Sequence, residues 1–175
     1  MVLYVRGWPA AKSLALPIGY LAFGLGLYRG LLDSVGFALQ GVTASAAALG
    51  AGVLHLGVWQ DGFVLHGSSF AFVVSQPCSG MSSLVSLLAL STLWVSLATG
   101  TLVARTIIVA AVLPVVIVAN GARVTLVLAV ASAFGQDAAL GFFHGASSFV
   151  LFGLAIVGLL GVGWLVGCKA PTFGR

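Results

Sequence analysis

Three short clusters hold most of the side chains in this sequence that could carry out covalent chemistry. A cysteine enzyme uses a thiol to attack a carbonyl and an imidazole to move protons. A guanidinium can hold the negative charge that develops on the carbonyl oxygen. The clusters supply one group each and are Gln76-Pro77-Cys78-Ser79-Gly80, Asn120-Gly121-Ala122-Arg123 and Phe142-Phe143-His144-Gly145. They predict Cys78 as nucleophile, His144 as general base and later general acid, and Arg123 as the oxyanion-binding group.

The local sequence supports a reactive Cys78. We expect a helix to begin at this cysteine, directly after Pro77, because proline suits the first helical position. The helix dipole and a nearby imidazolium would both favour the thiolate. We call Gln76 to Gly80 the nucleophile segment, and Ser79 and Gly80 are interpreted as its supporting residues.

Arg123 stands in an apolar stretch, where an ionisable side chain is costly and is a functional candidate by default. Asn120 precedes it by three residues and so lies on about the same side of a helix. We expect Asn120 to orient Arg123 or His144.

Composition determines the fold class. The chain has 175 residues, is 61% hydrophobic and only 6% charged, whereas a soluble domain carries about 25% charged residues. Lipid must solvate such a surface, and open sheet edges are not tolerated in hydrocarbon. We therefore predict an all-α membrane protein, a polytopic bundle of about five to six transmembrane helices. One integral membrane domain is expected over 1–175, with the motifs within 62–153.

The spacing of charges predicts helices at about 13–32, 35–59, 79–100, 105–134 and 142–167. Asn120-Gly121 is predicted to break the fourth, and Pro114 can kink it. Runs of small residues, such as those from Ala44 to Ala48, indicate either tight helix crossings or only the abundance of small residues that is usual in membrane helices.

Residues 61–77 have a different pattern. Two β-prone runs, 61–66 and 70–75, flank the turn Gly67-Ser68-Ser69, which is typical of a hairpin. We expect this hairpin at one membrane face, either as an ordinary structured loop or holding an extended peptide by strand addition. His66 lies within it and could replace His144 as the base.

Counting crossings tests whether the clusters can meet. Two complete crossings within 105–135 would put His144 a bilayer away from Cys78. Neither of the two candidate crossings, 105–119 and 121–135, reaches the roughly 20 residues that a span needs, so a single crossing is favoured. Arg123 then lies about 27 Å from Arg105, which brings it to the face of Cys78.

The distribution of Lys and Arg gives an orientation. Arg29, Arg105, Lys169 and Arg175 fall on the face opposite the clusters, whereas Arg6 and Lys12 fall on the same face as the clusters. This excess favours the opposite face as cytoplasmic. We therefore expect a multi-pass protein of the inner (cytoplasmic) membrane whose active site faces the extracytoplasmic side. The basic residues are scattered, so nucleic acid is not an expected partner.

Pro77-Cys78-Ser79-Gly80, Asn120-x-x-Arg123 and Phe143-His144, in this order, resemble the exosortase/archaeosortase family over about 62–153. The resemblance implies a membrane cysteine transpeptidase whose catalytic set is Cys78, Arg123 and His144. Its implied partners are exported proteins with a C-terminal sorting signal made of a short motif, a hydrophobic helix and a basic tail. It also implies an acyl-enzyme on Cys78 and transfer to an amine or water, without a cofactor.

Other functions fit the sequence less well. A membrane thiol oxidoreductase would need paired cysteines, but Cys168 is predicted at the opposite membrane face and is interpreted as structural. An intramembrane serine protease would need a glycine where Pro77 stands. The histidine spacing fits no compact metal site. A non-catalytic helical scaffold or channel subunit remains as the alternative.

Overall fold

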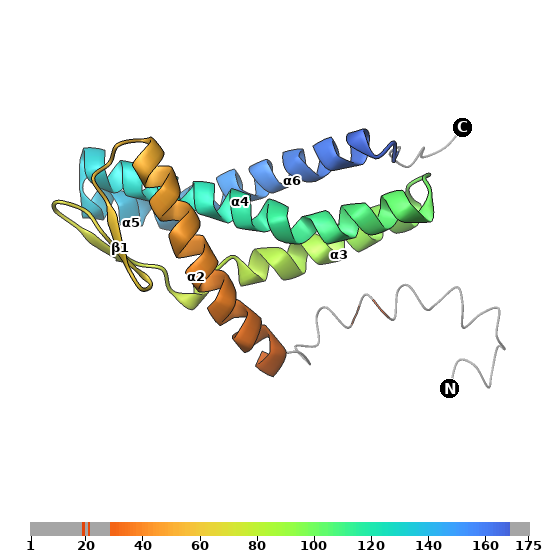
Figure 1. Ribbon diagram of the computed structural model, residues 1–175, viewed down its shortest axis with the longest axis horizontal. Helices are drawn as coiled ribbons and strands as arrows, with labels where there is room; N and C mark the ends of the chain where they lie inside the picture. The colour runs from red at the N-terminus through yellow and green to blue at the C-terminus, as the bar shows by residue number, and fades with distance from the viewer. Residues whose placement is uncertain (1–18, 20, 22–28, 169–175) are drawn as a thin grey trace.

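The computed structural model describes residues 29–168 together with Gly19 and Leu21. The predicted helix at 13–32 lies mostly outside these residues, as do Arg6, Lys12, Lys169 and Arg175. Along the chain, a long helix is followed by a small sheet, a 3-10 turn and four further helices (Figure 1). These are α2 (Arg29–Val53), β1 (Trp59–Asp61), β2 (Val64–His66), β3 (Ala71–Val73), η1 (Gln76–Cys78), α3 (Met81–Leu97), α4 (Leu102–Phe134), α5 (Gln136–Gly145) and α6 (Ser147–Leu165).

Helix α4 is the centre of the bundle, and α2, α3, α5 and α6 all pack against it. It is one continuous helix of 33 residues that contains Pro114, so the predicted break at Asn120-Gly121 is wrong. In lipid, a break would leave backbone groups without partners, and this cost outweighs the loop preference of Asn-Gly. Continuity excludes two complete crossings within 105–135, because an unbroken helix cannot return to the face at which it began.

Close packing of α2 on α4 accounts for the small residues. Ala44, Ala47 and Ala51 are fully buried, which confirms the predicted tight crossing. A Cβ at Gly121 would lie 2.8 Å from the Cβ of Ala46, so a larger residue here would push the helices apart. Gly121 is thus a packing residue within the helix rather than a helix breaker.

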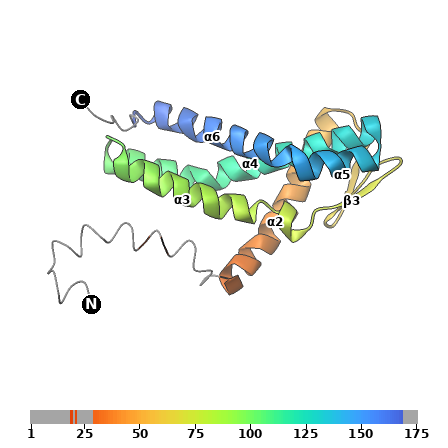
Figure 2. The same cartoon turned by 180° about the vertical axis from the view of Figure 1, so that it is seen from behind.

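The sheet and α5 lie together at one end of the bundle, as both ribbon views show (Figures 1 and 2). The strands are antiparallel in the order β1-β2-β3, so the predicted hairpin is confirmed as β2 and β3. The sequence reading missed β1 because it extended the preceding helix to residue 59, whereas α2 ends at Val53. We call this end of the molecule the sheet end.

The chain between α4 and α6 also differs from the prediction. Gly135 has a φ of 88°, which ends α4 and starts the separate helix α5. His144 therefore lies near the end of α5 instead of starting the last helix. Within the last eleven residues of α4, Val124, Val127 and Leu128 are fully buried, so neighbouring elements cover this part of the helix.

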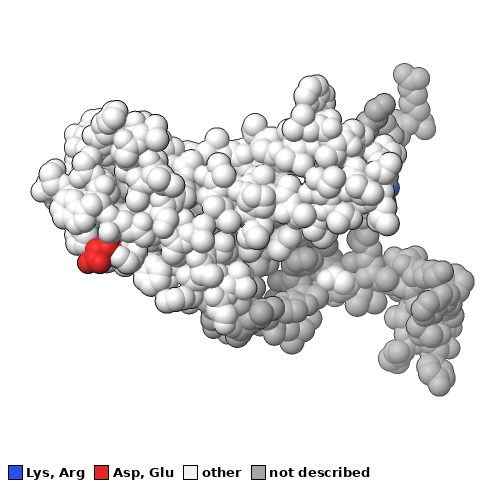
Figure 3. Space-filling model, viewed as in Figure 1, with Lys and Arg blue, Asp and Glu red and all other residues white. Residues whose placement is uncertain are grey.

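Three described helices are long and apolar enough to cross a membrane: Ser34–Val53, Leu102–Phe134 and Ser147–Leu165. The 17-residue α3 is apolar but shorter. The number of five to six crossings stays a prediction. In Figure 3 the described part of the visible face has almost no charged side chain, as expected for a lipid-facing surface. Cys168 is buried beside Ala98 and Ala104, at the end of the bundle opposite the sheet.

Candidate active site

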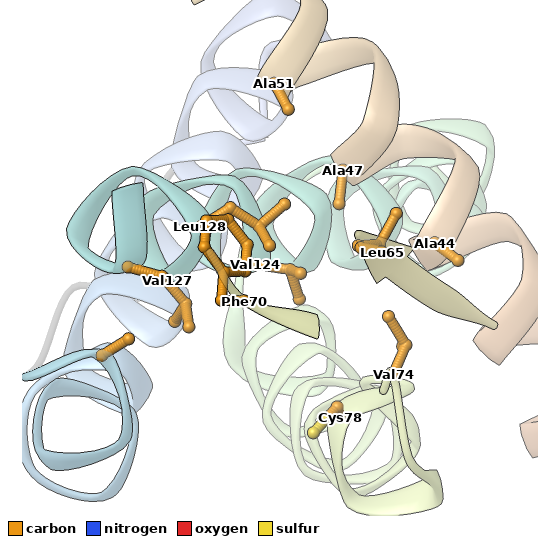
Figure 4. Close-up of a cluster of buried hydrophobic side chains, with 12 residues drawn as sticks. Ala44, Ala47, Ala51, Leu65, Phe70, Val74, Cys78, Val124, Val127 and Leu128 are labelled. Atoms are coloured by element: carbon orange, nitrogen blue, oxygen red, sulfur yellow. The ribbon is translucent and has the colours of Figure 1, made fainter. Parts of the chain in front are cut away.

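Cys78 ends the 3-10 turn η1 and is 3% exposed. Its side chain joins a cluster of apolar residues from α2, the sheet, α4 and α5 (Figure 4). The thiol sulfur lies 3.2 Å from the hydroxyl oxygen of Ser75, the residue that precedes the turn. Cys78 stands three residues before α3 begins at Met81, so the prediction that it begins this helix is wrong.

The turn that presents Cys78 is fixed by its own backbone and by Ser79. The N–H of Cys78 donates to the carbonyl of Ser75 at 2.8 Å. The hydroxyl of Ser79 donates to the carbonyl of Gln76 at 2.7 Å and accepts from the N–H of Met81 at 3.3 Å. Ser79 therefore ties η1 to the start of α3, which is a structural form of the supporting role predicted for it.

Gly80 is the N-cap of α3 and has a φ of 84°, a left-handed conformation that favours glycine. A Cβ at this position would also lie 3.0 Å from Nδ2 of Asn120. Both the backbone angle and the close side chain therefore require glycine beside Cys78.

Asn120 connects α4 to the nucleophile segment. It is fully buried, and its Nδ2 donates to the carbonyl of Cys78 at 2.7 Å and to Oγ1 of Thr43 at 3.0 Å. Among the described residues its Oδ1 has no hydrogen-bond partner. The expectation that Asn120 orients Arg123 or His144 is therefore replaced by a direct contact with the backbone of Cys78.

Arg123 lies one helical turn beyond Asn120 and is only 7% exposed. Its Nε donates to the hydroxyl oxygen of Ser147, the first residue of α6, at 3.1 Å. Asn120, one helical turn earlier on α4, bonds to the carbonyl of Cys78, so the same part of α4 holds both Arg123 and the link to the nucleophile. The structure thus brings two of the three predicted catalytic residues together at the sheet end.

His144 lies in α5, three residues before Ser147, so its backbone is near the residue that Arg123 contacts. Phe142, one half-turn earlier, packs against the apolar cluster that contains Cys78. The side chain of His144 is outside the described part of the structure. Its catalytic role therefore stays a prediction, although α5 itself belongs to the site.

His66 occupies a different place from the one expected of a base. Its ring stacks on Trp59 at a centroid distance of 5.4 Å. Successive strand residues point to opposite faces, and its neighbour Leu65 is the one that enters the cluster with Cys78. His55, just after the end of α2, is exposed. Among the side chains that the structure describes, which do not include Asp33 and His144, no group of three or more His, Cys, Asp or Glu could hold a metal.

Sequence reasoning missed three hydroxyl residues of the site: Thr43, Ser75 and Ser147. Thr43 and Ser147 are almost completely buried. Single serines and threonines are common in membrane helices and carry no periodic signal. The sequence contains one indication that these serines belong to the site: Ser75 lies three residues before Cys78, and Ser147 lies three residues after His144.

Comparison with known proteins gives one result. The model of the transmembrane exosortase family matches residues 1–161, well beyond the 62–153 that carry the sequence resemblance. No curated protein and no solved structure matches the chain.

Proposed function

Because the chain belongs to the transmembrane exosortase family, we propose that it is a membrane cysteine transpeptidase that removes C-terminal sorting signals from exported proteins. The observation that carries the proposal is the meeting of Cys78 and Arg123 at the sheet end. The two residues are 45 positions apart in sequence. Asn120, one helical turn before Arg123 on α4, donates to the Cys78 carbonyl, and Arg123 itself bonds to the buried Ser147. Burying a charged side chain in a membrane protein is costly, which makes Arg123 a candidate for a functional role.

The proposed reaction has two steps. In the first, the Cys78 thiol gives its proton to His144 and the thiolate attacks the scissile carbonyl, while Arg123 stabilises the oxyanion. The C–N bond then breaks, His144 returns the proton to the leaving amine, and a thioester remains on Cys78. In the second step, an acceptor amine or water attacks the thioester and restores the thiol.

Ser75 supports the thiolate in this scheme. Its hydroxyl lies 3.2 Å from the Cys78 sulfur and can donate to it once the thiol has lost its proton. A hydrogen bond to the charged form favours that form. The sequence predicts that the dipole of a helix beginning at Cys78 would favour the thiolate, but α3 begins only at Met81. The contact with Ser75 partly replaces that stabilisation.

The free edge of β3 is the proposed binding place for the sorting motif. Phe70 and Val74 form backbone hydrogen bonds with the residues that flank β2, so the backbone groups of Ala71 and Val73 point the other way. Both residues are exposed. An extended peptide added there would lie beside the segment that leads, five residues after Val73, to Cys78.

We place the protein in the inner membrane with the sheet end at the extracytoplasmic face. The three described spans support a membrane location. Arg105 lies at the start of α4, at the opposite end, where an excess of positive charge marks the cytoplasmic side.

A reporter assay tests the proposed function. The test reporter is an exported protein that ends in a short motif, a hydrophobic helix and a basic tail. It should lose the helix and the tail when the wild-type protein is co-expressed. A matched reporter with the same helix but without the short motif before it should stay intact. Equal cleavage of both reporters, or of neither, would contradict the proposal. The measurement is the reporter mass after membrane extraction.

A further inference from the structure

A chain of buried hydrogen bonds reaches the nucleophile segment from α2. Oγ1 of Thr43 donates to the carbonyl of Ser79 at 3.3 Å and accepts from Nδ2 of Asn120 at 3.0 Å. The same Nδ2 donates to the carbonyl of Cys78 at 2.7 Å. Three segments distant in sequence are therefore joined at two consecutive carbonyls, those of the nucleophile and its neighbour.

The donors and acceptors of these hydrogen bonds can be arranged in only one way. A backbone carbonyl only accepts hydrogen bonds, so the nitrogen of the Asn120 amide must face Cys78. Its second N–H then points to Thr43, whose single proton is left for Ser79. Removing the Thr43 hydroxyl would leave buried polar groups without a partner, which is costly in a medium without water.

We propose that Thr43 is a positioning residue for Cys78. Acting through Asn120 and the carbonyl of Ser79, it holds the η1 turn in the orientation from which the thiol attacks. This role rests on the proposed function, because it concerns the same nucleophile. It makes α2, which contributes none of the predicted catalytic residues, part of the catalytic apparatus.

The sequence offers a well-matched set of variants. Thr43→Val keeps the shape of the side chain and removes the hydroxyl, whereas Thr43→Ser keeps the hydroxyl. Thr125→Val is the control, since Thr125 is also buried between α2 and α4 but bonds to the carbonyls of Gly121 and Ala47. Because the chain has two cysteines, Cys168→Ala leaves Cys78 as the single thiol.

Two quantities are measured in this single-thiol background: cleavage of the reporter, and the rate at which N-ethylmaleimide alkylates Cys78. For Thr43→Val, kcat should fall by about 10- to 100-fold with KM unchanged, the usual effect of a misplaced reacting group. Alkylation should become faster, because a loosened turn exposes the buried thiol. Thr43→Ser and Thr125→Val should both behave as the parent does.

Partial unfolding would also lower activity and expose the thiol, so the Thr125→Val control is what distinguishes positioning from general damage. If Thr43→Val leaves either quantity unchanged, or if Thr125→Val reproduces its effects, the positioning role is wrong. Should Thr43→Val fail to accumulate in the membrane, the smaller Thr43→Ala gives the same test. If Cys78→Ala cleaves the reporter normally, the proposed function fails, while the alkylation rates still show whether Thr43 holds the turn.

Discussion

Replacing Cys78 by alanine should reduce reporter cleavage by at least about 10³-fold, to the background without enzyme, because no other group can form the acyl intermediate. Alanine suits the site, since Cys78 is buried among apolar side chains and its sulfur contacts the Ser75 hydroxyl. The loss should therefore be catalytic, with wild-type amounts of protein in the membrane.

The second cysteine provides the control for this experiment. Cys168 is equally buried but lies in an apolar cluster with Ala98, Ala104 and Ile108, far from the sheet end. Cys168→Ala should cleave the reporter at the wild-type rate. Full activity of Cys78→Ala, or equal losses in both variants, would remove the basis for a thiol nucleophile.

Arg123→Gln should lower kcat by about 10²- to 10³-fold, the range found when one oxyanion-binding donor is removed. Glutamine is shorter and uncharged, so it cannot keep the Nε contact with Ser147 or supply a positive charge to the oxyanion. Arg123→Lys should restore only part of the rate, because lysine keeps the charge but lacks the planar fork of donors. Steady-state cleavage of the reporter measures both variants.

Arg105 is the matched control, because it lies on the same helix at the opposite end. There its Nη2 donates to the carbonyl of Ala98 at 2.9 Å. Arg105→Gln should leave kcat unchanged even if it lowers stability. If Arg105→Gln and Arg123→Gln lose activity equally, removing either arginine from α4 has the same general effect. The assignment of Arg123 to the site is then wrong.

Much of the arrangement could be predicted, because the bilayer limits what an apolar chain can do. Segment lengths allowed one crossing between Arg105 and Phe134, and this alone brought Arg123 to the end where Cys78 lies. The hairpin before Cys78 was also recognisable, since turn residues separate two β-prone runs.

Other features depend on tertiary contacts that leave no local signal. Asn120-Gly121 has the composition of a break, yet Gly121 admits Ala46 of α2 and Asn120 bonds to Cys78, so both belong inside a helix. Thr43 could not be identified, because one hydroxyl in an apolar helix does not indicate which distant carbonyl it meets. The start of α3 was misplaced because η1 precedes it, and a short 3-10 turn resembles a helix start in sequence.

The central claim is that Cys78 carries the acyl group during the reaction, and mass spectrometry tests it most directly. Membranes containing the enzyme and the reporter are quenched with acid during turnover and digested, and the peptides that contain Cys78 are analysed. We predict that the new C-terminus of the reporter is attached to Cys78 through a thioester that hydroxylamine releases. A reporter acyl group attached to Ser79, or to any residue other than Cys78, would contradict this account.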